Sequence, residues 1–284
     1  METSEPEIPA PLPSSDEVDR LVDVAREAAV AAGDLVRSSR PDTVAVSGTK
    51  SSAVDVVTQM DLACEALVRE VIARQRPDDG VFGEEEGHAP GTSGVTWVID
   101  PIDGTVNYLY GIPAHAVSVA AVVGPADPAR WTLVAGCVHA VDGRTWTAGL
   151  GRGARLDGHP VTVNAAVPLA ESLVGTGFGY TVTRRQQQAR VVAEVLPRVR
   201  DIRRMGSAAL DLCQVAAGNL DLYYERGLQP WDLAAGALIA AEAGAVVTGL
   251  GGSRAGEAMT VAGPSGTVED LVALLEDLRA DQDG

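Results

Sequence analysis

The chain has 284 residues, of which 46% are hydrophobic and only 4% aromatic, and its formal net charge is −17. A chain of this length and composition can bury a large core, so it is not a disordered protein, and its small aliphatic side chains favour a layered body of helices and sheets. The negative charge repels phosphate backbones and anionic lipids, which argues against a nucleic-acid or membrane-surface role.

Residues 1–15 are acidic and rich in proline, and they lack the basic and apolar regions of a signal peptide, so we expect a disordered N-terminal tail. No apolar run reaches the ~18 residues that a membrane helix needs. Cys64, Cys137 and Cys213 are too widely spaced to indicate a disulfide framework or a zinc site. Reduced thiols and a cytoplasmic location are the expectation.

The N-terminal half, about residues 16–165, begins with a predicted amphipathic helix over 16–38, for which Ser14 or Ser15 is a plausible N-cap. A β-branched segment with a Gly-Thr-Lys-Ser-Ser turn leads into a second helix over about 59–75. Short β-like runs then predict a substantial, largely antiparallel sheet. These runs cover residues 81–85, 96–100, 116–124, 132–141, 145–149, 154–158 and 161–163.

The C-terminal half, about residues 166–278, alternates strand and helix patterns, which predicts a second sheet covered by helices. The predicted strands cover 172–178, 201–205, 221–225, 245–249 and 259–263. The predicted helices cover about 185–199, 207–218, 232–244 and 267–278. No repeat, linker or shift in composition separates the halves, so we expect one unit over 16–284, with a cleft between the halves and an acidic tail after 278.

The stretch WVIDPIDGTVNY places two carboxylates, Asp100 and Asp103, at the end of an apolar run that indicates a buried strand. A buried pair of anions is costly unless a cation neutralises it. If the chain turns helically after Pro101, both carboxylates share one face, and the amides of Gly104 and Thr105 lie at a helix N-terminus where an anion could dock. A turn with two solvated acids is the alternative.

Further acids lie at predicted strand ends or helix starts, namely Asp61, Glu84 and Asp232. The spacing of Thr58 and Asp61 is that of a capping box, which leaves helix capping and metal binding equally open for Asp61. Glu84 follows an apolar strand, although residues 84–86 could also form a solvated acidic loop. Hard oxygen ligands without nearby histidine or cysteine favour Mg²⁺, Mn²⁺ or Ca²⁺ over zinc, and Mg²⁺ is the first choice.

Lys50 is the only lysine of the chain. A compact ammonium at this position indicates a possible electrostatic role, and chance in an arginine-rich sequence is the alternative. The sequence lacks the glycine-rich loops of nucleotide-binding proteins and the GxSxG elbow of serine hydrolases.

Three motifs, GEE at 83–85, WVIDPIDGTVNY at 97–108 and PWDLAAGALIAAEAG at 230–244, closely resemble the inositol monophosphatase family, in its bacterial form. The similarity extends to residues 50–61 and 206–227. This resemblance implies an α+β fold, the layered α-β-α-β-α sandwich shared with the fructose bisphosphatases, and commonly a homodimer. It also implies a magnesium-dependent, lithium-sensitive phosphatase.

The resemblance further implies two or three Mg²⁺ ions and assigns a role to each matching residue. The expected ligands of the first ion are Glu84, Asp100 and the carbonyl of Ile102, and those of the second are Asp100, Asp103 and Asp232. Thr105, paired with Glu84 or Asp61, would orient the attacking water, with Asp61 at the outer edge of the site. The expected substrate contacts are Asp103, Gly104, Thr105, Ala208 and Glu225, the last two at the inositol ring.

The expected reaction is hydrolysis of myo-inositol 1-phosphate or a related polyol phosphate. Ser207, where relatives often carry threonine, and the variable stretch 176–180 leave the substrate open. The alternatives to the polyol phosphate are histidinol phosphate, fructose 1,6-bisphosphate and a nucleotide 3'-phosphate. The Gln229-Pro230 lead-in does not resemble the lysine-containing one of the nucleotide branch. A non-catalytic regulatory partner is an alternative of another class, which the intact set of acids and the negative charge argue against.

Overall fold

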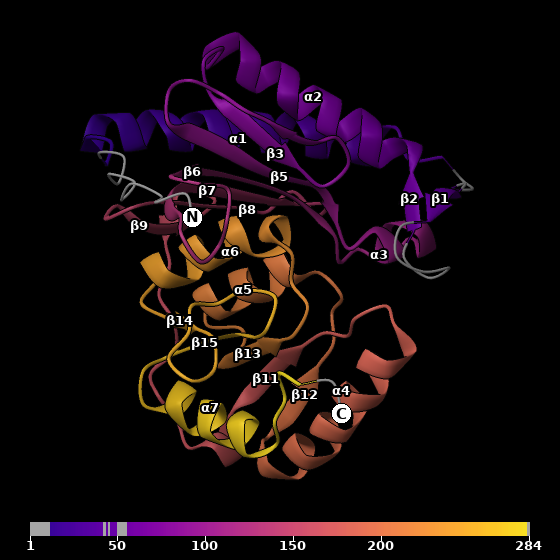
Figure 1. Ribbon diagram of the computed structural model, residues 1–284, viewed down its shortest axis with the longest axis vertical. Coiled ribbons are helices and arrows are strands. Elements are labelled where there is room, and N and C mark those ends of the chain that lie inside the picture. Colours follow the sequence, from indigo (N-terminus) through magenta and orange to yellow (C-terminus); the bar gives the residue numbers. More distant parts are fainter. Residues whose placement is uncertain (1–11, 42–43, 45, 50–55, 283–284) are drawn as a thin grey trace, which may run out of the picture.

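The computed structural model describes residues 12–41, 44, 46–49 and 56–282, and these form five stacked layers (Figure 1). In order, the layers are a helix pair, an eight-stranded sheet, a second helix pair, a five-stranded sheet and a third helix pair. This arrangement confirms the expected α-β-α-β-α sandwich. Residues 1–11 of the expected tail and Lys50 lie outside the described residues.

The first layer contains α1 (Ser15–Ser38) and α2 (Gln59–Gln75), which confirm the two predicted helices. Ser14 is the N-cap of α1. The buried stripe of α1 consists of valine, leucine, alanine and one glycine, and these small side chains let the helix pack closely on the strands below. Before α2, β1 (Val46–Thr49) and β2 (Val56–Thr58) form an antiparallel pair.

The eight-stranded sheet has the order β10-β9-β8-β7-β6-β5-β3-β4, and only the pairing of β3 with β5 is parallel. The predicted, largely antiparallel sheet is therefore confirmed. Every residue of β6 is buried, because helices cover both faces of the sheet. The strands are β3 (Gly80–Gly83), β4 (Gly87–Ala89), β5 (Val95–Asp103), β6 (Ala116–Val123), β7 (Thr132–Ala140), β8 (Thr145–Gly149), β9 (Gly153–Leu156) and β10 (His159–Pro160).

The five-stranded sheet has the order β12-β11-β13-β15-β14 and lies between two helix layers. Its strands are β11 (Leu173–Thr176), β12 (Asp201–Arg203), β13 (Leu222–Glu225), β14 (Val246–Thr248) and β15 (Thr260–Gly263). The helices of this half are α4 (Val182–Val195), α5 (Ala208–Ala216), α6 (Pro230–Glu242) and α7 (Thr267–Asp277), with short 3-10 turns at Leu169–Glu171 and Leu196–Arg198. Every residue of α5 is buried, because this helix lies between the two sheets.

Helix ends in the C-terminal half differ from the prediction by at most four residues, and the larger differences have local reasons. α6 begins at Pro230, because the fixed φ of proline suits the first helical position. α4 begins at Val182 behind Thr181, which caps it. It ends at Val195, and Pro197 in the following 3-10 turn lacks the N–H that a longer helix would need.

The prediction of a strand at residues 161–163 is wrong, since no strand is formed there. The amide of Val163 instead donates to the carbonyl of Ala243 just beyond α6. Val161 and Val163 pack against the hydrophobic core between the eight-stranded sheet and the middle helix layer, which accounts for their β-like pattern. α6 itself contacts β5, β6, β7 and β8, so the two halves share one interior.

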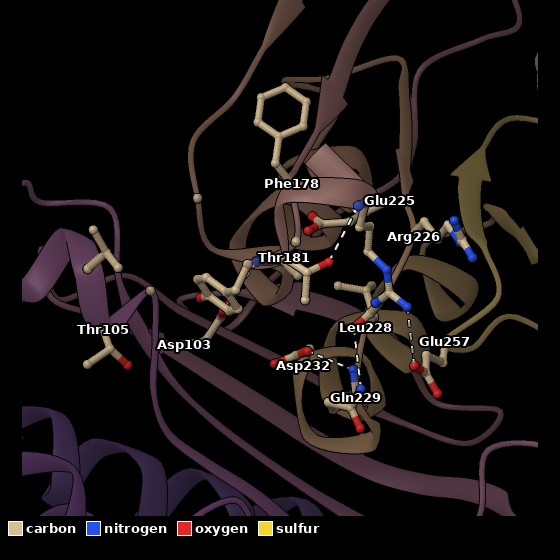
Figure 2. Close-up of a pocket in the computed structure, with 18 of the residues that line it drawn as sticks. Asp103, Thr105, Phe178, Thr181, Glu225, Arg226, Leu228, Gln229, Asp232 and Glu257 are labelled. Atoms are coloured by element: carbon tan, nitrogen blue, oxygen red, sulfur yellow. Dashed lines mark hydrogen bonds and ion pairs between the residues drawn. The ribbon is translucent and has the colours of Figure 1, made fainter. Parts of the chain in front are cut away.

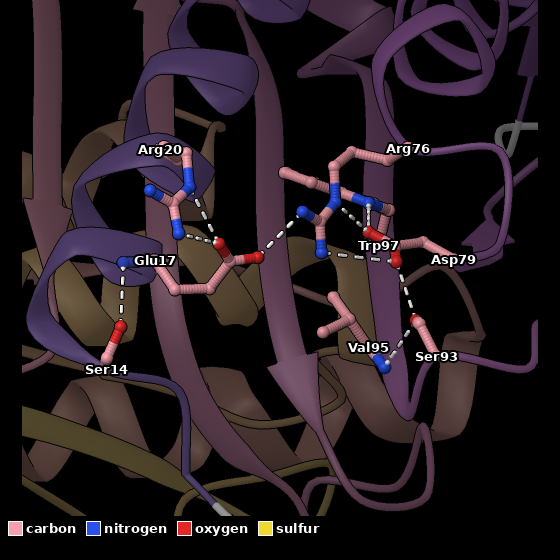
Figure 3. A network of polar contacts seen from close by, with 8 residues as sticks. All are labelled: Ser14, Glu17, Arg20, Arg76, Asp79, Ser93, Val95 and Trp97. Atoms are coloured by element: carbon pink, nitrogen blue, oxygen red, sulfur yellow. Dashed lines mark hydrogen bonds and ion pairs between the residues drawn. The ribbon is translucent and has the colours of Figure 1, made fainter.

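A polar network holds α1 and the end of α2 against the start of β5 (Figure 3). Arg76 contacts Glu17 of α1 at 2.7 Å and Asp79 at 2.8 Å. Asp79 also accepts a hydrogen bond from the indole of Trp97, which is fully buried in β5. Because β5 carries Asp100 and Asp103 at its other end, this network helps to fix the strand from which the site is built.

None of the helices among the described residues is long and apolar enough to cross a membrane. Cys64, Cys137 and Cys213 are all buried and free.

Candidate active site

A bulge in β5, and not a helical turn, brings Asp100 and Asp103 together. β5 stays extended through Asp103, and the short helix α3 (Thr105–Tyr110) begins only after Gly104, so the chain does not turn helically directly after Pro101. Gly104 and Thr105 do lie at a helix start, as considered from the sequence. The pairing of β5 with β6 is irregular between the two aspartates. One extra residue on the bulged strand reverses the side to which the next residues point, so carboxylates three residues apart can face the same side.

Asp100, Asp103 and Asp232 form a tight acidic cluster, with one carboxylate oxygen from each lying within 4.8 Å of the others. Burial, followed by the charges of Glu84, Asp103 and Asp232, raises the pKa of Asp100 well above its usual range. Burial also raises the pKa of Asp232 well above its ordinary value, again with Glu84 and Asp103 adding to the effect. A cation would relieve this repulsion, and hard carboxylate oxygens suit Mg²⁺, so the residues fit the expected metal.

Asp103 is also attached to the start of α5. Its carboxylate accepts hydrogen bonds from the hydroxyl of Ser207 at 2.6 Å and from the amides of Ala209 at 2.7 Å and Ala208 at 3.3 Å. Burial raises the pKa of Asp103 to about 6, and these donors limit the rise. The helix N-terminus of one half thereby holds an acid from the other half.

Asp61 performs the capping role and also contacts the site. One carboxylate oxygen accepts from the amide and the hydroxyl of Thr58, at 2.8 and 2.5 Å, which confirms the capping box. The other accepts from the hydroxyl of Thr105 at 3.2 Å. Of the two partners expected for Thr105, the structure brings Asp61 into hydrogen-bond contact. The Thr105 hydroxyl also lies 3.1 Å from the carbonyl of Ile102.

Glu225, at the end of β13, lies across the cavity from the N-terminal acids. The hydroxyl of Tyr223 donates to its carboxylate at 2.7 Å. Burial raises the pKa of Glu225 to about 7, while Tyr223 and Arg204 act in the opposite direction and Asp103 adds to the rise. Glu225 is therefore a carboxyl group whose charge changes close to neutral pH.

The predicted residues surround a cavity of about 610 Å³. In Figure 2, the purple N-terminal segments carry Asp103 and Thr105, and the brown C-terminal segments carry Glu225 and Asp232. This volume lies in the range of sites for small molecules. The predicted residues in the cavity wall are Glu84, Asp103, Gly104, Thr105, Ala208, Glu225 and Asp232.

The other predicted residues lie behind that wall. Asp100 and Ile102 are 1% exposed and Asp61 is fully buried. These residues therefore affect the site through the groups that they contact. Gly104 has a φ of +97°, and a Cβ there would lie 2.9 Å from the carbonyl oxygen of Ala114, so the position requires glycine. Lys50 lies outside the described residues.

The fold places several groups here to which no sequence motif assigned a role. Ser207, which drew attention only as a departure from relatives, is a hydrogen-bond donor to Asp103. Asp211 is 1% exposed, and neither carboxylate oxygen has a hydrogen-bond partner among the described residues. A lone acid in an apolar helix was the available signal for Asp211. Arg184 and Arg204 also line the cavity, and no motif pointed to them.

Comparisons with known proteins agree with this geometry. The family model described as "Inositol monophosphatase family" matches residues 17–280. The inositol-1-monophosphatase SuhB of Mycobacterium tuberculosis is 47% identical over 278 residues, covering 90% of this chain and 93% of that protein. The Nus factor SuhB of Escherichia coli is 35% identical over 236 residues, covering 82% and 86%. The solved structure of Mycobacterium tuberculosis SuhB superposes with a TM-score of 0.77 at 45% identity, covering 93% and 98%.

Proposed function

Because the chain belongs to the inositol monophosphatase family of phosphatases, we propose that it is a magnesium-dependent enzyme that hydrolyses myo-inositol 1-phosphate or a related polyol phosphate. The observation that carries this proposal is the cluster of Asp100, Asp103 and Asp232, which lies beside a cavity whose opposite wall holds Glu225.

The proposed ligands are those that the family resemblance implied. Glu84, Asp100 and the carbonyl of Ile102 would hold one ion, and Asp100, Asp103 and Asp232 would hold another, with a third ion as an option. Bound Mg²⁺ would supply charge stabilisation for the attacking and leaving oxygens and would lower the pKa of bound water.

Thr105 and Asp61 would orient the attacking water. The Thr105 hydroxyl donates its hydrogen to Asp61, so the lone pairs of its oxygen remain free to accept a hydrogen bond from a water molecule in the cavity. This water would transfer its proton toward the Thr105 and Asp61 pair as it attacks the phosphorus atom. The amides of Gly104 and Thr105, at the start of α3, would bind phosphate oxygens.

Glu225 and Ala208 would contact the polyol part of the substrate. A carboxylate is a strong acceptor for sugar hydroxyls, and Tyr223 holds Glu225 in place by its 2.7 Å hydrogen bond. Ala208 lines the same wall and leaves space for a ring. These contacts favour substrates whose leaving group is an uncharged polyol over substrates whose leaving group has no hydroxyls.

A substrate panel tests the proposal. Phosphate release is measured with and without Mg²⁺ from inositol 1-phosphate, fructose 1,6-bisphosphate, histidinol phosphate and a nucleotide 3'-phosphate. We expect Mg²⁺-dependent hydrolysis, highest kcat/KM for the inositol ester, and at least 100-fold lower kcat for Asp103→Asn, in line with the loss of a metal ligand. Li⁺ should inhibit by competing at the second metal position. Absence of Mg²⁺-dependent release from every ester would refute the proposal.

A regulatory role is the second candidate, and the 35% identity to the Nus factor SuhB of Escherichia coli favours it. The net charge of −17 argues that any such role works through a protein partner and not through direct contact with nucleic acid. Asp103→Asn separates the two roles, because it should abolish hydrolysis and leave partner binding unchanged.

We also propose, from the family resemblance, that the enzyme is a homodimer. The three free, buried cysteines support the proposal that it works in the cytoplasm. A monomeric mass in sedimentation equilibrium at micromolar concentration would contradict the dimer.

A further inference from the structure

Glu65 is a fully buried acid that lies outside the cavity, and no sequence motif gave it a role. It lies on α2 one helical turn after Asp61, so both side chains emerge on the same face of the helix. Asp61 reaches Thr105, whereas Glu65 reaches the turn between β3 and β4. A buried carboxylate is retained only where its environment satisfies it, which directs attention to its partners.

The partners of Glu65 are consecutive amides of the turn that carries Glu84. Its two carboxylate oxygens accept from the amide of Glu85 at 2.8 Å and from the amide of Glu86 at 3.1 Å. The amide of Glu84 itself donates to the carbonyl of Ile99 in β5 at 3.2 Å. The backbone of Glu84 is therefore fixed on both sides, by the sheet before it and by Glu65 after it.

Gly83 makes room for this contact. A Cβ at Gly83 would overlap the carboxylate of Glu65, so a larger residue would force the acid away from the turn. The glycine of the GEE motif thus has a packing reason in this fold.

Arg69 neutralises Glu65 and reaches the far end of the same turn. Its guanidinium lies 2.8 Å from the Glu65 carboxylate and donates to the carbonyl of Gly87, also at 2.8 Å. The ion pair compensates the buried charge, so Glu65 does not add repulsion to the acidic cluster. Together the two side chains bind the turn at three backbone groups.

We propose that Glu65, supported by Arg69, is a positioning residue that orients Glu84 for binding a divalent cation. The inference rests on the proposed function, in which Glu84 is a metal ligand. Glu84 lies beside Asp100, and its charge is the largest contribution of a neighbouring group to the raised pKa of that aspartate. A turn that is held in place before the ion arrives loses less conformational freedom on binding, which strengthens the interaction.

The test compares Glu65→Gln with a matched control, Glu242→Gln. Glu242 accepts hydrogen bonds from the amides of Gly151 and Gly153, both at 2.8 Å, in a turn away from the cavity. In both variants one of the two carboxylate oxygens that accept from backbone amides is lost. Only Glu65→Gln affects the turn that carries Glu84. Binding of Mn²⁺ to the full chain is followed by the loss of the free-ion signal in electron paramagnetic resonance, alongside Mg²⁺ activation of hydrolysis.

We expect Glu65→Gln to weaken Mn²⁺ binding by about 10-fold or more, the usual effect of removing a group that orients a ligand. The Mg²⁺ concentration for half-maximal activity should rise by a similar factor, with kcat at saturating Mg²⁺ within about threefold of the parent. Glu242→Gln should leave both unchanged. Parent-like Mn²⁺ binding by Glu65→Gln, or an equal loss in Glu242→Gln, would overturn the inference.

If Glu65→Gln does not fold, Arg69→Lys decides the question, because lysine keeps the charge but cannot reach both Glu65 and Gly87 in a fork. A folded Arg69→Lys protein should bind Mn²⁺ several-fold more weakly, and unchanged binding would overturn the inference. The direct metal measurement also keeps the two proposals separate. A parent protein that binds Mn²⁺ and hydrolyses no ester contradicts the proposed function, whereas an active parent with an unaffected Glu65→Gln contradicts only the positioning role.

Discussion

Replacing Glu225 by glutamine should stabilise the metal-free protein at alkaline pH and leave it unchanged at acidic pH. Burial raises the pKa of this carboxyl from its ordinary value of 4.5 to about 7. A carboxyl group whose pKa is higher in the folded than in the unfolded protein keeps its full contribution to the free energy of unfolding below its unfolded pKa. That contribution is lost as the pH rises through the folded pKa. Glu225 therefore destabilises the fold increasingly between about pH 4.5 and pH 7.

The magnitude follows from the same shift. A rise of this size corresponds to at most about 3 kcal/mol above pH 7. The carboxyl lies at the wall of an open cavity, where water screens part of the effect, so we expect about 1 to 2 kcal/mol. Glutamine keeps the acceptor oxygen for Tyr223 and carries no charge, so it removes the penalty with little change in packing.

Urea unfolding with a chelator present, at pH 5 and at pH 8.5, measures this difference. Glu225→Gln should have a higher free energy of unfolding than the parent at pH 8.5 and an almost equal one at pH 5. Glu257→Gln is the control, because this acid also lines the cavity but its side chain is 64% exposed. Its effect should stay within about 0.5 kcal/mol at both values. A Glu225→Gln protein that is no more stable than the parent at pH 8.5 would refute the reasoning.

Two further changes probe the proposed chemistry. Thr105→Ala should lower kcat by about 100-fold at saturating Mg²⁺, because the hydroxyl that joins Asp61 to the attacking water is lost. Thr105→Ser keeps a hydroxyl and should retain most activity. Equal activity of the two variants would contradict this role. Mg²⁺ at about 100 times its Kd should raise the free energy of unfolding by about 2.7 kcal/mol, measured by urea titration, and a chelator should reverse the gain. Asp103→Asn should show almost none of it, so a parent-like gain in that variant would exclude Asp103 as a ligand.

Local patterns in the sequence predicted much of the local structure around the site residues. The apolar run before Asp100 predicted a buried strand that ends in acids, and β5 has this form. The Thr58 and Asp61 spacing predicted a capping box, which the structure contains. Such features depend on neighbours within a few residues, so periodicity and capping chemistry are enough to predict them.

Contacts between distant parts of the chain were decided only by the tertiary structure. Asp103 meets Ser207 across 104 positions of sequence, and Glu65 meets the Glu85 amide across 20. The bulge that turns Asp100 and Asp103 to one side depends on the register with β6, which no spacing within WVIDPIDGTVNY reveals.

By itself, the sequence determined which acids end strands or begin helices, because hydrophobic periodicity and capping are local. It did not determine the partners of those acids. The raised pKa of Asp103 comes from burial, and that of Glu225 comes from burial and from the charge of Asp103. Both causes exist only once the two sheets enclose the cavity. The contact of Glu65 on α2 with the turn that follows β3 likewise exists only in the folded chain, because the two segments lie far apart in the sequence.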